Sequence, residues 1–143
     1  MTLDMQQLHG HWRLVSFLEQ RPNGEWFPFL GEGAKGYISY WPGGRMQVVM
    51  AAGDRPRLRG GWASIPADQK AVCLDRMVAY SGSFDVQADR VVHYVDVCWI
   101  PNWEGRELVR LVEMPDPDQL VLSTVPDPEG RRPVQRVFWE RME

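Results

Sequence analysis

Arg110 is the residue whose position in the sequence most strongly suggests chemistry. In the predicted strand 106–114, the acidic Glu107 and Glu113 are expected to face solvent, which turns Arg110 inward among apolar neighbours. A guanidinium group is always charged, so burying it without a partner is unfavourable. We expect Arg110 to bind a ligand carboxylate, phenolate or enolate. The alternatives are an internal carboxylate that the sequence does not identify, or a one-residue change in register that exposes Arg110 to solvent.

His93, Tyr40 and Tyr80 are expected on the same inner face as Arg110. Near neutral pH an imidazole could move a proton in an isomerisation or cyclisation while Arg110 stabilised the developing oxyanion. The alternative for His93 is a buried side chain hydrogen-bonded to tyrosine or to the backbone. The tyrosines would either orient a polar group of the ligand or serve only in packing. These four residues are the candidate catalytic set.

Other chemistries have weak support in the sequence. His9 and His11 share one side of an extended segment, but no third metal ligand follows at a defined spacing. The segment 31–33, Gly-Glu-Gly, leads into a predicted strand, so it does not form a phosphate-binding loop at a helix start. A haem would need a second histidine on the face of His93. We therefore expect no metal and no cofactor.

The elements that must position these residues show the two-residue alternation of β-strands. The eight segments with this alternation are 12–19, 36–41, 45–51, 79–86, 91–99, 106–114, 119–125 and 134–141. A helical period occurs once, at about 66–78. One short helix cannot cover both faces of such a sheet, so the sheet must close on itself. We predict an all-β fold, an eight-stranded antiparallel up-and-down β-barrel forming a single domain over 1–143, with the helix as a plug or flank.

The predicted hairpins also indicate which side chains face the interior. A four-residue turn at 87–90 pairs Phe84 with His93 and Tyr80 with Val97. The expected ligand-binding wall consists of Ile38, Met46, Val48, Met50, Phe84, Val95, Val97, Trp99, Leu108, Val112 and Met114. The same residues would also describe a filled core, although the seven tryptophans of the chain favour a wide interior.

Composition limits the partners of this chain. It has 143 residues, a formal charge of −3 at pH 7 and no run of lysine or arginine, so no nucleic acid partner is expected. It contains no apolar stretch of about 18 residues, and its first residues lack the apolar run of a secretory signal. These features predict a cytoplasmic protein without a membrane partner. Tyr37 and Trp41 are expected on the outside, where they could support a homodimer or another protein contact.

Both ends of the sequence carry motifs that resemble the calycin superfamily. The pattern Gly10-x-Trp12 opens the first predicted strand, and Arg141 lies in the last. Between them the chain resembles one branch, the lipocalin-like domain family, over almost its whole length. The matching segments are Gly36 to Tyr40, Gly44 to Met46, Asp54 to Arg57, Ala79 to Gly82, Val92-His93, Pro101 to Trp103 with Gly105, and Arg110.

The resemblance implies a barrel with a small-molecule cavity, in which Trp12 plugs the closed end and Arg141 stacks across it. Gly10, Trp12 and Arg141 are therefore expected to be structural. The chain departs from many relatives at Tyr94, where they carry a second histidine, so no His-His pair is expected.

Two functions follow from these expectations. The first is binding of a hydrophobic small molecule, with an acidic or enol group facing Arg110. The second is a cofactor-independent isomerase or cyclase acting on a polyketide or terpenoid biosynthetic intermediate in the same cavity. Whether the protein is an enzyme stays open at this point, and a protein-interaction module is a third possibility.

Overall fold

The computed structural model describes residues 2–142, which form nine β-strands, one α-helix and three short 3-10 turns. The strands are β1 (Gly10–Gln20), β2 (Trp26–Pro28), β3 (Lys35–Tyr40), β4 (Arg45–Ala51), β5 (Met77–Gln87), β6 (Arg90–Cys98), β7 (Glu107–Asp116), β8 (Gln119–Thr124) and β9 (Gln135–Arg141). The helix is α1 (Ala67–Asp75), and the turns are η1 (Met5–Gln7), η2 (Trp62–Ser64) and η3 (Pro101–Trp103).

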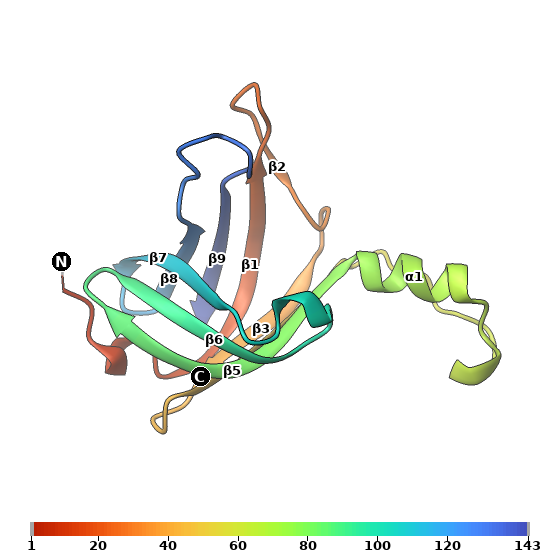
Figure 1. Ribbon diagram of the computed structural model, residues 1–143, viewed down its shortest axis with the longest axis horizontal. Coiled ribbons are helices and arrows are strands. Elements are labelled where there is room, and N and C mark those ends of the chain that lie inside the picture. The colour runs from red at the N-terminus through yellow and green to blue at the C-terminus, as the bar shows by residue number, and fades with distance from the viewer. Residues whose placement is uncertain (1, 143) are drawn as a thin grey trace.

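The strands close into an antiparallel barrel (Figure 1). Strands β3 to β9 each pair with the next strand in the chain, and β1 pairs with both β3 and β9. Closure leaves no open edge among these eight strands, which removes a site of unwanted strand pairing. The ninth strand, β2, is a three-residue strand that pairs only with the end of β1. The predicted eight-stranded barrel is therefore confirmed, and β2 is an addition to it.

The β5–β6 hairpin has the predicted register near its turn. Val86 pairs with Val91, and Phe84 pairs with His93. Both members of the second pair are buried, so the inner face of this hairpin follows the alternation of the sequence.

Further from the turn, this hairpin contains an irregularity that the sequence reading missed. The register shifts between Ser81 and Gly82, so that Tyr80 pairs with Cys98 instead of Val97. Val97 consequently faces outward and is 62% exposed. The expectation that Val97 lines the interior is wrong, because the extra residue in β6 turns Cys98 inward and Val97 outward.

Helix α1 neither plugs nor flanks the barrel. It projects away from the strands at the end of an extension between β4 and β5 (Figure 1), and none of its residues is buried. It is also shorter than the predicted 66–78, because β5 already begins at Met77. Near the base of the extension, Arg76 forms an ion pair with Asp54 at 2.8 Å. Of its residues, only Leu74 and Asp75, at the end of the helix, line the cavity described below.

The closed end of the barrel is built around Trp12. Its side chain is fully buried and donates a hydrogen bond from Nε1 to the carbonyl oxygen of Leu8 at 2.9 Å. The Arg141 guanidinium lies 4.1 Å from the centre of the Trp12 ring and donates to the carbonyl oxygen of His9 at 2.7 Å. Gly10 has a φ of 122°, a conformation that other residues rarely adopt. These contacts have the geometry expected for Gly10, Trp12 and Arg141.

Candidate functional site

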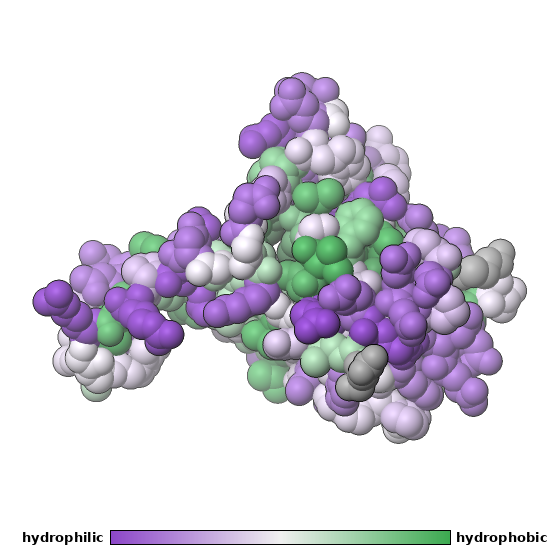
Figure 2. Space-filling view, turned by 180° about the vertical axis from the view of Figure 1, so that it is seen from behind, coloured by the Kyte–Doolittle hydropathy of each residue, from purple (hydrophilic) through white to green (hydrophobic). Residues whose placement is uncertain are grey.

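A cavity of about 510 Å³ opens at the end of the barrel opposite Trp12. A volume in this range suits a small organic ligand. Of the residues expected to bind a ligand, those that line the cavity are Ile38, Val48, Met50 and Trp99, together with the candidate catalytic residues Tyr80, His93 and Arg110. Figure 2 shows apolar side chains gathered in a hollow between the projection that carries α1 and the β1–β2 hairpin, with hydrophilic side chains around them.

The remaining residues of the expected wall do not line this cavity. Met46, Phe84, Val95 and Val112 are buried in the hydrophobic core, and Leu108 and Met114 pack against it. They pack into the interior together with Trp12 and therefore correspond to the filled-core alternative. Alternation along a strand reveals which face points inward but not how deep along the barrel a residue lies.

Several residues that line the cavity were not identified from the sequence. They include Phe17, Phe29, Leu122, Val137 and Trp139. Leu122 and Val137 are cross-strand partners on β8 and β9, two strands for which the sequence reading assigned no facing. The alternation in these strands was the signal that could have found them. Trp103, which was not among the residues expected in the ligand-binding wall, also lines the cavity.

His93 lies between two tyrosine hydroxyl groups at the polar side of the cavity. Its Nε2 atom is 2.7 Å from the hydroxyl oxygen of Tyr40, and its Nδ1 atom is 2.8 Å from that of Tyr80. His93 and Tyr40 are each 1% exposed. The structure thus brings together three of the four candidate catalytic residues, with His93 as the tyrosine-bonded buried histidine that was the alternative to a free acid or base. Tyr80 and His93 line the cavity, whereas Tyr40 lies behind them.

Burial keeps this cluster uncharged. Burial, together with the nearby Arg110 charge, lowers the pKa of His93 to about 3. Burial raises the pKa of Tyr40 and of Tyr80 above the ordinary tyrosine value, and the positive charge of Arg110 only partly opposes that effect. At neutral pH all three groups are therefore neutral hydrogen-bonding groups, and His93 is not an imidazolium acid.

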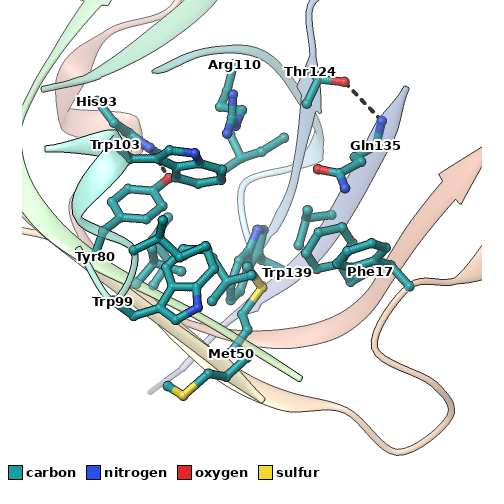
Figure 3. Close-up of a pocket in the computed structure, with 18 of the residues that line it drawn as sticks. Phe17, Met50, Tyr80, His93, Trp99, Trp103, Arg110, Thr124, Gln135 and Trp139 are labelled. Atoms are coloured by element: carbon teal, nitrogen blue, oxygen red, sulfur yellow. Dashed lines mark hydrogen bonds between the residues drawn. The ribbon is translucent and has the colours of Figure 1, made fainter. Parts of the chain in front are cut away.

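Arg110 supplies the positive charge beside this cluster. Its side chain projects from β7 towards the cavity (Figure 3). One Nη1 donor reaches the neighbouring carbonyl oxygen of Val109 at 3.1 Å. Within residues 2–142 no carboxylate lies within 4.0 Å of its guanidinium group, so the internal ion pair considered from the sequence is not formed there. The half-buried charge keeps donors that can bind an anion.

Trp139 and two polar residues complete this part of the site. The indole Nε1 atom of Trp139 is buried and has no hydrogen-bond partner in the described part of the chain. Thr124 and Gln135 are further polar residues of the wall, and Thr124 accepts a hydrogen bond from the Gln135 backbone at 2.9 Å.

Aromatic rings form much of the rest of the wall. Trp99 and Trp103 meet edge to face with ring centres 5.2 Å apart, and Phe17 stacks on Phe29 at 5.0 Å. In Figure 3, Arg110 and Thr124 lie on one side of the cavity, while Trp99 and Met50 lie on the other. The cavity therefore combines a large apolar surface with one positively charged side.

Within residues 2–142 the structure contains no group of three or more histidine, cysteine, aspartate or glutamate side chains placed to hold a metal ion. In the same range, no helix has the length and apolar character needed to cross a membrane.

Comparison with known proteins identifies one family. The profile of a lipocalin-like domain matches residues 9–142. No curated protein matches the sequence.

Among solved structures, a redesigned β-barrel is 12% identical with a TM-score of 0.48, covering 100% of this chain and 98% of its own. A de novo designed fluorescence-activating β-barrel is 14% identical with a TM-score of 0.46, covering 99% and 100%. A mutant of the fluorescent protein UnaG is 16% identical with a TM-score of 0.44, covering 98% and 99%. Similarity at this distance does not extend to function.

Proposed function

Because this chain belongs to the lipocalin-like domain family, we propose that its barrel binds a hydrophobic small molecule carrying an acidic or enol group. The observation that supports this proposal is Arg110, a half-buried charge on the wall of a largely apolar cavity and without a carboxylate partner among residues 2–142. A ligand oxyanion would supply the missing partner.

The energetics of the cavity favour such a ligand. Burial of apolar surface contributes about 25 cal/mol per Å², so the aromatic wall would provide most of the affinity. A charge-assisted hydrogen bond between Arg110 and an anionic oxygen would add about 1.5–3 kcal/mol. Together these groups select a molecule that is apolar over most of its surface and negatively charged at one end.

The test is titration of the protein with 2-naphthoate, followed by intrinsic tryptophan fluorescence. Trp99, Trp103 and Trp139 line the cavity, so saturable binding should change the emission. Arg110→Met should raise the Kd for 2-naphthoate by about 10- to 150-fold, which corresponds to the loss of about 1.5–3 kcal/mol. Arg106→Met is the matched control, because Arg106 is exposed and does not line the cavity. Its Kd should equal that of the wild type.

Two outcomes would contradict the proposal. One is the absence of saturable binding to the wild-type protein by both 2-naphthoate and its neutral analogue 2-acetylnaphthalene. The other is equal affinity of the wild type and Arg110→Met for 2-naphthoate.

The position of Tyr80 beside Arg110 favours a second candidate, a cofactor-independent isomerase or cyclase. Its substrate would be a polyketide or terpenoid biosynthetic intermediate held in the apolar cavity. Arg110 would stabilise negative charge on a substrate oxygen, as in an oxyanion hole. Incubation with such intermediates distinguishes the two candidates, because an enzyme variant Arg110→Ala should lose turnover while it still binds the product. A carrier would show no turnover with any intermediate.

A further inference from the structure

The hydroxyl groups of Tyr40 and Tyr80 differ in what else surrounds them. Both lie within hydrogen-bond distance of His93, but only Tyr80 also lines the cavity. Tyr40 is 1% exposed, and within residues 2–142 its hydroxyl group has no hydrogen-bond partner besides His93. The two contacts are therefore not interchangeable.

A neutral imidazole has one N–H donor and one acceptor nitrogen. If Nε2 carried the proton, it would donate to the Tyr40 oxygen, and the O–H of Tyr40 would then be buried without an acceptor. If Nδ1 carries the proton, Tyr40 donates to Nε2, and Nδ1 donates to the Tyr80 oxygen. Each arrangement leaves one tyrosine O–H without an acceptor in the protein. The second leaves the O–H of Tyr80, which lines the cavity, whereas the first leaves that of Tyr40, which lies behind it. An unpaired donor enclosed by protein is the more unfavourable of the two, so the second arrangement is favoured.

The surroundings of Tyr80 support the same direction of the hydrogen bonds from Tyr40 through His93 to Tyr80. In this arrangement its oxygen accepts the hydrogen bond from His93 Nδ1 and also lies beside the Arg110 guanidinium group (Figure 3). With the hydrogen bond from Nδ1 and the positive charge of Arg110 both at the oxygen, the O–H of Tyr80 points away from them, and the open space next to Tyr80 is the cavity.

We propose that Tyr40, His93 and Tyr80 form a one-directional hydrogen-bond chain that makes Tyr80 a donor to an acceptor oxygen of the ligand. His93 and Tyr40 are positioning residues in this chain, and Tyr80 touches the ligand. Successive hydrogen bonds in a chain polarise one another, so the Tyr80 donor is stronger than an isolated phenol. The inference rests on the proposed function and narrows the ligand class to carbonyl, carboxylate or enolate compounds whose oxygen reaches both Tyr80 and Arg110.

The first measurement needs no ligand. In ¹⁵N-labelled protein, long-range ¹H–¹⁵N correlation spectra distinguish a protonated ring nitrogen of histidine from an unprotonated one. His93 should show a protonated Nδ1 and an unprotonated Nε2, and this pattern should be the same at pH 7 and pH 5, because burial keeps the ring neutral. A protonated Nε2 would overturn the proposal.

The second measurement compares two probes of nearly the same shape. The ketone 2-acetylnaphthalene has an acceptor oxygen, whereas 2-isopropenylnaphthalene carries a CH₂ group in its place. Tyr80→Phe should raise the Kd of the ketone by about 3- to 10-fold, the loss of one hydrogen bond, and should leave the Kd of the hydrocarbon unchanged. Tyr37→Phe is the matched control, because Tyr37 is 48% exposed and lies outside the cavity. It should change neither Kd.

The results separate the two proposals. If the wild type binds neither probe nor 2-naphthoate, the proposed function fails, and the nitrogen spectra still decide the direction of the chain. If both probes bind and Tyr80→Phe weakens them equally, ligand binding stands and the donor role of Tyr80 is wrong. A selective loss of ketone affinity together with a protonated Nδ1 supports the whole inference.

Discussion

The buried histidine should make the stability of this protein depend on pH in a way that one substitution removes. His93 is 1% exposed and its pKa is lowered to about 3, against 6.5 in an unfolded chain. The unfolded chain therefore takes up a proton as the pH falls through 6.5, whereas the folded protein does not until the pH approaches 3. Protonation favours the unfolded state, so this contribution to stability is complete above pH 6.5 and is lost as the pH falls towards 3.

The size of the effect follows from the two pKa values. Linkage between proton binding and unfolding gives a loss of about 2 kcal/mol between pH 7 and pH 5, and about 3 kcal/mol by pH 4. His93→Gln removes the titrating group but keeps an amide donor and a carbonyl acceptor for the two tyrosine hydroxyls. We expect the variant to be less stable than the wild type at pH 7, and its disadvantage to shrink by about 2 kcal/mol at pH 5.

Urea denaturation at pH 7 and pH 5 measures this difference directly. The free energy of unfolding is obtained for the wild type, His93→Gln and the control His11→Gln. His11 is exposed and hydrogen-bonded to Ser39 at 2.7 Å, and the control retains His93, so its loss between the two pH values should match that of the wild type. Carboxylates are common to all three proteins and cancel in the comparison. If His93→Gln and the wild type lose the same free energy between pH 7 and pH 5, His93 is not a buried neutral histidine and the reasoning fails.

Two further substitutions test the closed end of the barrel and the irregular pairing of β5 with β6, both by urea denaturation. Arg141→Met removes the cation over Trp12 and its hydrogen bonds to backbone carbonyl groups. This substitution should lower the free energy of unfolding by about 1–3 kcal/mol. An unchanged free energy of unfolding would mean that the contact between Arg141 and Trp12 does not stabilise the closed end. Gly82→Ala places a methyl group against the Tyr94 carbonyl group and should cost about 1–3 kcal/mol. Gly43→Ala, with nothing within 4 Å of the added carbon, is its control and should differ by less than about 0.5 kcal/mol. Equal effects of the two alanine substitutions would show that the irregularity at Gly82 is not tightly packed.

Much of the barrel could be predicted from the sequence because its signals are local. A pleated strand turns alternate side chains to opposite faces, so the eight alternating segments predicted the strands. The hairpin turn at 87–90 predicted the pairing of Phe84 with His93. Gly10, Trp12 and Arg141 could be assigned by resemblance. A glycine backbone and an arginine side chain both lie close to the Trp12 ring, and this arrangement requires particular residue types that can be recognised in a sequence.

The facing of one strand residue, the depth of side chains along the barrel and the position of the helix could not be predicted, because they depend on tertiary structure. Val97 faces outward because the strand pairing shifts near Gly82, where the backbone of the next strand leaves no room for a side chain. Met46 fills the core while Met50, on the same strand and the same face, lines the cavity, so depth along the barrel decided between them. Helix α1 was expected to plug or flank the barrel and instead projects from it, because a periodic stripe does not specify a partner surface.

For the candidate site, the sequence by itself indicated the inner face of most strands, with a charge and an imidazole on neighbouring strands. Only the tertiary structure decided that His93 is held between Tyr40 and Tyr80, and that no carboxylate within residues 2–142 neutralises Arg110. The physical reason is that facing depends on the two-residue period of one strand. Hydrogen-bond partners and empty volume depend on side chains brought together from strands that are distant in the sequence.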